Sequence, residues 1–440
     1  MIARINRFLF VLGSLVLSVD SIAGPSIESW TTDAGARVLY VQAPEIPMFD
    51  VRVTFAAGSA RDGEQKGVAN ITSALLTQGT DELDANAFSD QLGATGAKLS
   101  TGARRDMAYL GLRTMAQEEY SVPALALMEA AMARPRFAVD AIDRLKARAM
   151  IAFRHKQQSP GAIIDEAFYA DVYGEHPYGS PPDGNEESVA ALKRDDFSAF
   201  HQRHYVARNM VIAIVGALDK DRAQSIATRL SAALPQGEAA PALPEVLPTT
   251  GASRHIEFSS IQSHVRVGLP GMRRGDADYF PLLVGNHALG GNSLVSLLFK
   301  EIRSKRGLSY SASSHFTPMA QAGPFVATLQ TDRSQQDEAV RVLNETLADF
   351  VNNGPPDDAL KAAKQNLVGG FPLRIDSNQK ITEYLAMIGF YKLPLDYLDT
   401  FTTSVAAVTS ESVRDAFKRR LVLDQLVTVI VGRAKASDDS

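Results

Sequence analysis

The chain offers few groups that could serve as a nucleophile. Ser377 and Lys380 have the Ser-x-x-Lys spacing in which a lysine can activate a serine hydroxyl, but the accompanying Lys-Thr-Gly is absent. We expect Asp376 or Ser377 to cap the helix that follows instead. No Gly-x-Ser-x-Gly elbow and no phosphate loop occurs, and the chain contains no cysteine. These absences exclude thiol nucleophiles, thiolate metal ligands and disulfides.

Histidines could ligate a metal, but the eight in this chain are scattered. The closest local pair is His201 and His204 in "FHQRHY", and because no acid accompanies it we expect a polar helix face. Glu175-His176 matches the end of the inverted zinc motif His-x-x-Glu-His, but Val172 stands where the first histidine belongs. The sequence therefore predicts no zinc site.

Hydrophobic patterning indicates the elements that position these groups. Strand-like runs cover 51–55, 108–113, 210–215, 265–269, 325–331 and 426–431. Amphipathic helices are expected over 120–133, 140–153, 335–351 and 357–368. Several helices separate consecutive strands, and other strands form hairpin-like pairs. This arrangement favours an α+β fold in which mostly antiparallel sheets carry helices packed on one face.

The chain repeats itself at a nearly constant offset. "VRVTF" at Val51 resembles "VRVGL" at Val265, an offset of 265 − 51 = 214, and "AIVG" ending at Gly216 matches "VIVG" ending at Gly432. Four proline residues within 235–251 indicate an extended linker. We expect two homologous domains, 24–234 and 252–440, joined by the linker 235–251.

The first residues resemble an export signal. Arg4 and Arg7 precede an apolar run, and Ser21-Ile22-Ala23 offers a cleavage site, so residues 1–23 are expected to be a signal peptide. The apolar run is shorter than the roughly 20 residues that a membrane-spanning helix needs. We expect a periplasmic protein without a membrane span. The net charge of −5 argues against nucleic acid as a partner.

Three stretches together resemble the insulinase-like, or pitrilysin-like, zinc peptidases, which include the mitochondrial processing peptidase. These are "GSARDGEQKGVANITSALLTQGT", "YGEHPYGSPPDGNEESVAAL" and "LGGNSLVSLLFKEIRSKRGLSYSASSHF". The resemblance spans nearly all of the chain after residue 23. It implies two homologous domains that form half of a clamshell.

The family's zinc helix is degenerate in this chain. Asn70 and Ala74 occupy the positions of the two histidines, and Ser73 occupies that of the general-base glutamate. The family's third ligand falls within 149–153, a segment without an acid. The resemblance therefore implies a chain that holds no metal, with zinc expected in a partner subunit.

The resemblance also implies an arginine and a tyrosine, seven residues apart, that point at the scissile carbonyl of the substrate. Arg303 and Tyr310 have this spacing in "RSKRGLSY", and Arg306 is the alternative arginine. We expect Arg303 to end a helix that starts at Leu294, and Tyr310 to lie early in a strand. Such donors stabilise an oxyanion but do not generate a nucleophile.

Loss of the zinc groups beside retention of Arg303 and Tyr310 favours a non-catalytic, substrate-binding subunit of a heterodimeric zinc metallopeptidase. Its partner would be a zinc-motif homologue, and its substrates peptides. A peptide-binding scaffold or chaperone with the same fold is the alternative, and a homodimer is a third possibility.

Overall fold

Two sheets of the same design form the framework of the protein. The computed structural model describes residues 26–292 and 294–433, so the expected signal peptide lies outside the described residues. The first sheet has the strand order β1-β2-β6-β3-β5-β4, and the second has β7-β11-β8-β10-β9. The strands are β1 Glu28–Thr31, β2 Arg37–Gln42, β3 Met48–Phe55, β4 Lys98–Ala103, β5 Ala108–Met115, β6 Met210–Gly216, β7 Ala252–Glu257, β8 Gln262–Met272, β9 Ser309–Phe316, β10 Gly323–Asp332 and β11 Val427–Gly432.

The order β2-β6-β3-β5-β4 in the amino-terminal half corresponds to β7-β11-β8-β10-β9 in the carboxy-terminal half. In each half one pair is parallel, β2 with β6 and β7 with β11, and the other pairs are antiparallel. This matched pairing accounts for the repeats in the sequence, because equivalent strands need equivalent apolar patterns.

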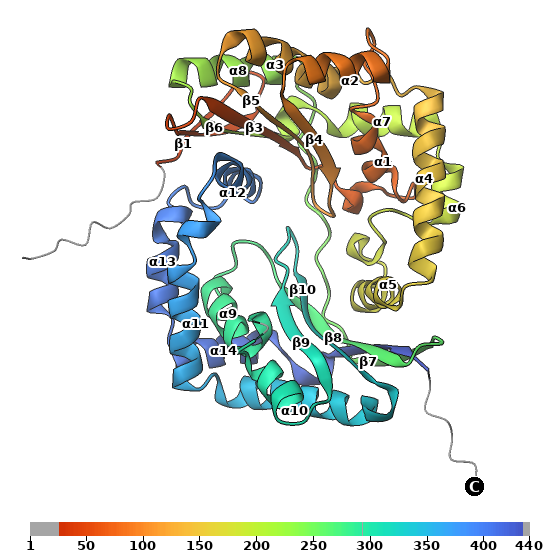
Figure 1. Cartoon of the computed structure of the whole chain (residues 1–440), viewed down its shortest axis with the longest axis vertical. Coiled ribbons are helices and arrows are strands. Elements are labelled where there is room, and N and C mark those ends of the chain that lie inside the picture. The colour runs from red at the N-terminus through yellow and green to blue at the C-terminus, as the bar shows by residue number, and fades with distance from the viewer. Residues whose placement is uncertain (1–25, 293, 434–440) are drawn as a thin grey trace, which may run out of the picture.

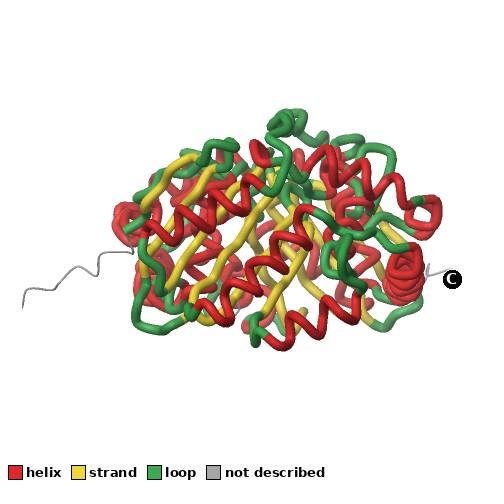
Figure 2. The backbone as a smooth tube through the Cα atoms, turned by 90° about the horizontal axis from the view of Figure 1, so that it is seen from above, coloured by secondary structure: helices red, strands yellow, loops and turns green. Residues whose placement is uncertain are grey.

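Helices cover the outer face of each sheet (Figures 1 and 2). The helices of the amino-terminal half are α1 Val68–Leu75, α2 Ala85–Ala94, α3 Glu118–Ala133, α4 Val139–Gln157, α5 Pro160–Tyr173, α6 Glu186–Ala191, α7 Arg194–His204 and α8 Lys220–Ala232. Those of the carboxy-terminal half are α9 Tyr279–Asn286, α10 Gln336–Asn353, α11 Asp357–Gly369, α12 Asn378–Phe390, α13 Tyr397–Ala407 and α14 Ser410–Arg420. The predicted α+β class with two homologous domains is confirmed.

Each half also lends one helix to the other. α12 packs on the inner face of the first sheet, where Leu385 and Ile388 join a buried cluster with Leu39 and Val211. α5 packs in the same way on β8 and β11 of the second sheet (Figure 1). Each sheet therefore carries, on its inner face, a helix that belongs to the other half of the chain. The spacing of apolar residues along the chain did not predict this exchange.

A buried carboxylate joins the two halves. Asp106, in the turn between β4 and β5, accepts hydrogen bonds from Tyr178 Oη at 2.5 Å and Tyr391 Oη at 2.8 Å. It also accepts from the backbone N–H of Ala320 at 2.7 Å. Three donors satisfy the carboxylate, and two of them come from the carboxy-terminal half. This contact fixes the two sheets relative to one another.

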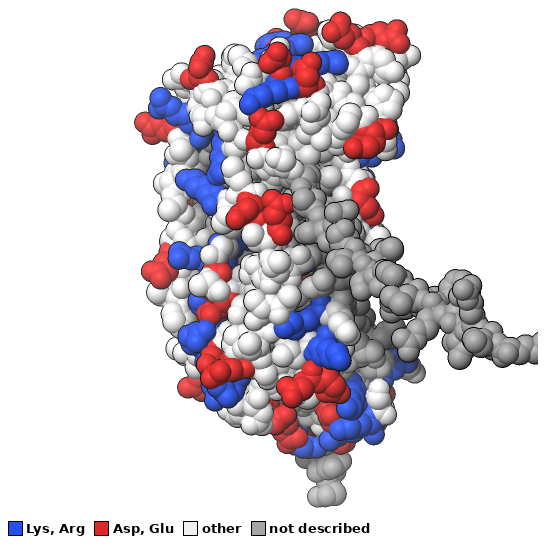
Figure 3. All heavy atoms as spheres, turned by 90° about the vertical axis from the view of Figure 1, so that its left-hand side faces the viewer, with Lys and Arg blue, Asp and Glu red and all other residues white. Residues whose placement is uncertain are grey.

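Residues 235–251 contain neither helix nor strand. The segment is held in place by side chains from both halves. Arg61 Nη2 donates to the Pro241 carbonyl at 2.8 Å, and Gln321 Nε2 donates to the Leu243 carbonyl at 2.9 Å. On the face drawn in Figure 3, basic and acidic side chains are interspersed and form no field of one sign.

Candidate functional site

Helix α1 lies where the resemblance places the zinc helix. It begins after Gly67, whose φ of 90° requires glycine. The buried Asp62 carboxylate accepts the backbone N–H groups of Gly67 at 2.7 Å and Ala69 at 3.1 Å. Burial raises the pKa of Asp62 to about 7, and the two backbone donors oppose that rise. The carboxylate thus anchors the start of the helix.

The groups on α1 do not fit a zinc ion. Asn70 Nδ2 donates to Asp183 Oδ1, and the second oxygen of Asp183 lies 2.5 Å from Lys156 Nζ. Ser73 is 1% exposed, and Ala74 has no polar side-chain atom. An amide, a hydroxyl and a methyl group replace two imidazoles and a carboxylate, and an ammonium group occupies the vicinity where a metal would need anionic ligands.

The third ligand is missing as well. Residues 149–153 lie within α4, which contacts α1, and the segment reads Ala-Met-Ile-Ala-Phe. Across the described residues, no group of three or more histidine, aspartate or glutamate side chains could hold a metal ion. We therefore derive no chemical step in this chain through zinc.

The histidine pair of α7 is buried, so the prediction of a polar helix face is wrong. His201 and His204 are 8% and 6% exposed. His201 Nε2 lies 2.8 Å from the Met132 carbonyl, and its ring stacks on Tyr205 at 4.8 Å. The polar faces of α7 carry other residues, because both imidazoles point into the aromatic core beneath the helix.

Two other sequence patterns have structural explanations. Ser377 is the N-cap of α12 and accepts the backbone N–H of Lys380, while the Lys380 ammonium lies 2.9 Å from Asp376 Oδ1. The expected capping role is confirmed for Ser377. His176 lies beyond the end of α5, where its Nε2 is 3.0 Å from the Pro244 carbonyl, and Val172 is buried in the core.

Arg303 lies in the wide helical turn η5, Phe299–Ser304, which has π geometry. The Lys305 N–H donates to the Lys300 carbonyl five residues back, as a π turn requires. Gly307, with φ +65°, then releases the chain as expected. The helix does not start at Leu294, which is 71% exposed in a turn stabilised by the side chain of Asn292.

Tyr310 lies in the edge strand β9, as predicted. Leu329 pairs with Ala312 and Thr331 pairs with Ser309, so Tyr310 and Ser311 together oppose one residue of β10. This is a β-bulge, which re-aims side chains. Ala312 faces the helix-covered core, whereas Tyr310 is 80% exposed. The bulge therefore turns the phenol away from the core and toward the sheet face on which α5 packs.

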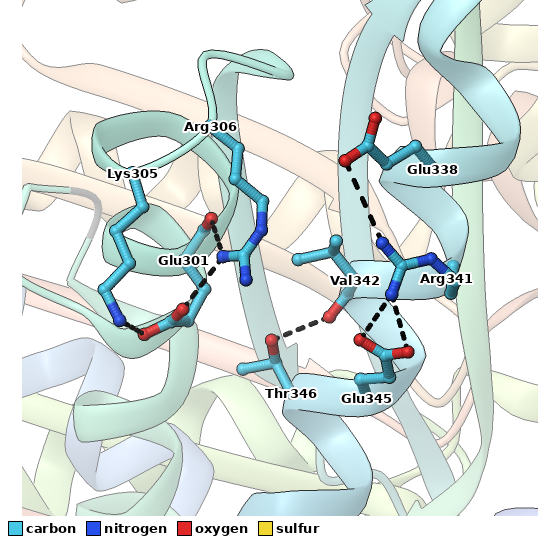
Figure 4. Close-up of polar contacts among 8 residues, drawn as sticks. All are labelled: Glu301, Lys305, Arg306, Glu338, Arg341, Val342, Glu345 and Thr346. Atoms are coloured by element: carbon cyan, nitrogen blue, oxygen red, sulfur yellow. Dashed lines mark hydrogen bonds and ion pairs between the residues drawn. The ribbon is translucent and has the colours of Figure 1, made fainter.

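The charges next to Arg303 are compensated by one acid. Glu301 Oε1 lies 2.7 Å from Lys305 Nζ, and Glu301 Oε2 lies 3.0 Å from Arg306 Nη1 (Figure 4). Within 26–292 and 294–433, Arg303 makes no ion pair, and its guanidinium lies 5.0 Å from the ring centroid of Phe299. Glu301 thus occupies Arg306 and leaves Arg303 available.

The sequence did not reveal Asp183, Lys156 or Glu301 as members of these networks. Asp183 lies 113 residues from Asn70 along the chain. No local pattern reports such a contact. Glu301 could have been found, because it lies four residues before Lys305 on a helical segment, a spacing that pairs opposite charges.

Comparisons with known proteins agree with the fold. The family model described as Insulinase (Peptidase family M16) matches residues 37–183, and the model described as Peptidase M16 inactive domain matches residues 191–367. A crystal structure described as a peptidase M16 inactive domain, from Pseudomonas fluorescens, is 36% identical. Its TM-score is 0.91, and the match covers 93% of this chain and 98% of that one.

More distant relatives are consistent with this match. A non-peptidase homolog of Helicobacter pylori is 24% identical, over 91% of this chain and 93% of its own length. An uncharacterized zinc protease of Mycobacterium leprae is 27% identical, over 79% of each chain. The crystal structure of a Helicobacter pylori protease, 18% identical with a TM-score of 0.83, shares the fold.

The fold and the degenerate helix define a peptidase-like protein built from two homologous domains. The chain belongs to peptidase family M16, and it is an inactive, non-catalytic member of that family. Among the helices of the described residues, none is long and apolar enough to cross a membrane.

Proposed function

We propose that this chain is the substrate-binding subunit of an exported, heterodimeric zinc metallopeptidase that degrades peptides. The partner, a homologue with an intact zinc motif, supplies the metal, its ligands and the general base. This chain supplies Arg303 and Tyr310, which donate hydrogen bonds to the scissile carbonyl oxygen.

The observation that carries the proposal is the availability of Arg303. The other two cations of the segment, Lys305 and Arg306, share Glu301, while Arg303 is exposed and its guanidinium, among the described residues, contacts the ring of Phe299 without an ion pair. An unpaired guanidinium keeps its fork of N–H donors free for an oxygen that gains negative charge. The π turn that carries Arg303 supports the proposal, since such turns are frequent at functional sites.

Tyr310 supports the same assignment. The phenol is 80% exposed, so packing does not explain why a tyrosine occupies this position. The residue follows the turn at Gly307, which brings the chain back beside the end of the helix. As water attacks a peptide carbonyl, the oxygen becomes an oxyanion, and a donor aimed at it accelerates the step by roughly 10²–10³-fold. Neither Arg303 nor Tyr310 activates water, so the nucleophile has to come from the partner.

Export to the periplasm is part of the proposal. It is supported by the arrangement of Arg4, Arg7 and the apolar run that follows them, and by the absence of cysteine. Fractionation of cells that express the full chain, with amino-terminal sequencing of the product, tests this part. A product that begins at Gly24 in the periplasmic fraction agrees with it, and an uncleaved cytoplasmic product contradicts it.

The experiment that tests the proposal is reconstitution. The chain is purified alone and together with a zinc-motif homologue encoded nearby, and hydrolysis of a quenched fluorescent peptide is followed. We expect activity only in the mixture. An active homologue whose turnover is the same with and without this chain would instead support the alternative role as a peptide-binding scaffold.

A further inference from the structure

A cavity of about 480 Å³ lies between α5 and the inner face of the second sheet. Its volume is within the range of small-ligand sites. Apolar and aromatic groups, including Phe168, Tyr169 and Val326, form one part of its lining. The charged side chains of Arg105, Lys156 and Arg266, together with the carboxylates of Asp165 and Glu166, form another. The cavity thus combines an apolar wall with a charged wall of three cations and two carboxylates.

Two of the three cations are already paired. Lys156 Nζ lies 2.5 Å from Asp183 Oδ2, and Arg266 Nη2 lies 2.6 Å from Asp165 Oδ1. Arg105 differs from them, because within the described part of the chain it makes no ion pair. It is therefore the cation of this cavity that retains capacity for an anion.

Packing holds the Arg105 guanidinium in place. Its centre lies 3.7 Å from the ring centroid of Tyr169, and its Nε donates to the Tyr178 carbonyl at 3.0 Å. The neighbouring Asp106 carboxylate is engaged by two tyrosines and a backbone N–H. The terminal nitrogens of Arg105 thus have no carboxylate of their own.

Arg105 is half-buried, so its guanidinium has lost part of its hydration. Desolvation lowers the pKa of Arg105, although the nearby tyrosines and Asp106 act in the opposite direction. A guanidinium nevertheless stays protonated in proteins. A stacked, partly desolvated guanidinium fork matches the two oxygens of a carboxylate and gains more from that pairing than an exposed one does.

We propose that this cavity binds the carboxylate of a peptide, with Arg105 as the anchor. The peptide's C-terminal carboxylate is the expected group, because the apolar wall formed by Phe168 and Val326 suits the side chain of the terminal residue. This inference rests on the proposed peptide-binding function and defines one feature of the substrate.

The position of the cavity gives a spacing along the substrate. His315 lines the cavity and, like Tyr310, lies on the α5-facing side of β9. The two residues are five positions apart, which is roughly 16 Å in an extended strand. A substrate that follows β9 would therefore place its carboxylate about five residues from the carbonyl that Tyr310 contacts.

The test uses the purified chain alone, so it does not depend on a partner or on zinc. Fluorescence anisotropy measures binding of a short labelled peptide with an apolar last residue, prepared as the free acid and as the C-terminal amide. We expect the free acid to bind at least about tenfold more tightly, as a charge-assisted hydrogen-bond pair implies. Equal binding of the two peptides would overturn the inference, even if the reconstituted peptidase were active.

Variants assign the effect to Arg105. Arg105→Gln should remove the difference between acid and amide, and Arg105→Lys should keep part of it, because charge remains but the fork is lost. Arg254→Gln is the matched control, since Arg254 pairs with Asp171 beside a neighbouring cavity. An acid preference that survives in Arg105→Gln, or is lost in Arg254→Gln, would contradict the assignment.

A third peptide identifies the source of the carboxylate. An amidated peptide that ends in glutamate carries a side-chain carboxylate in place of the terminal one. If it binds as weakly as the other amide, the cavity is specific for a C-terminus, as expected. If it binds as tightly as the free acid, Arg105 anchors peptide carboxylates of either origin, and the preference for the C-terminus is wrong.

Discussion

Nη1 of Arg306 lies 3.0 Å from Oε2 of Glu301 and 2.9 Å from the Glu301 carbonyl oxygen. Arg303, three residues earlier, makes no ion pair in the part of the chain that the structure describes. The two arginines therefore form a natural pair of test and control, with the same charge and neighbouring positions but different availability.

Arg303→Ala should lower the turnover of the reconstituted heterodimer by roughly 10²-fold, because one donor to the oxyanion is lost. Steady-state kinetics on a fluorescent peptide measures this. Arg306→Ala should stay within a few-fold of the unmodified complex. Equal losses for both variants would indicate a general effect of charge and would contradict the assigned role of Arg303.

Tyr310→Phe removes a single hydroxyl from a side chain that is 80% exposed. We expect kcat to fall while the thermal unfolding midpoint stays unchanged, because no buried contact is altered. Kinetics and calorimetry on the same preparation separate the two effects. A variant with full kcat would remove the phenol from the proposed mechanism.

Asn70→Ala should leave peptide hydrolysis by the complex unchanged. It should cost about 0.5–1.5 kcal/mol of unfolding free energy, because the amide donates to Asp183. Urea denaturation measures the cost. A large loss of turnover without a loss of stability would show that Asn70 takes part in the reaction, against our interpretation of α1.

Acid should destabilise the protein through His204. Burial, with the charges of Arg61 and Arg203, lowers the pKa of this imidazole to about 4 from its ordinary 6.5. At this imidazole the unfolded state binds more protons than the folded state between these values, so the stability that His204 contributes is present above pH 6.5 and is lost as pH falls toward 4. Denaturation curves across this range should show that the unfolding free energy of His204→Gln depends less on pH than that of the unmodified protein. If the slope of unfolding free energy against pH is the same in the variant, His204 does not contribute to the acid sensitivity.

The exchanged helix α12 depends on a close approach at Gly389. A Cβ there would lie 2.5 Å from Val211 Cγ1 and 2.6 Å from Leu39 Cδ1. Gly389→Ala should therefore cost about 1–3 kcal/mol. Gly369→Ala, in α11 with nothing within 4 Å, is the control and should be neutral or stabilising by up to about 1 kcal/mol. Equal stabilities would contradict the packing described for α12.

Local patterns were sufficient to predict the central strands and long helices, because alternation and helical spacing are properties of neighbouring residues. They also placed Arg303 before a glycine turn and Tyr310 in a strand. The exchange of α5 and α12 was not predictable in this way, since each helix contacts strands far away in sequence. His201 and His204 were misjudged for the same reason, because burial depends on what covers the helix.

The candidate site could likewise be predicted only in part from the sequence. Loss of zinc groups at Asn70, Ser73 and Ala74 follows from their residue types once the resemblance to the family assigns these positions. The ammonium of Lys156 beside Asp183 and the bulge that re-aims Tyr310 follow from tertiary contacts, so only the structure reveals them.

The most direct test of the central claim is cleavage of a peptide by the highly purified chain in the absence of any partner, with and without a chelator. We predict no cleavage by the chain alone, and chelator-sensitive cleavage once the zinc-motif homologue is added. Chelator-sensitive cleavage by the isolated chain would contradict the account, because it would mean that this polypeptide generates its own nucleophile.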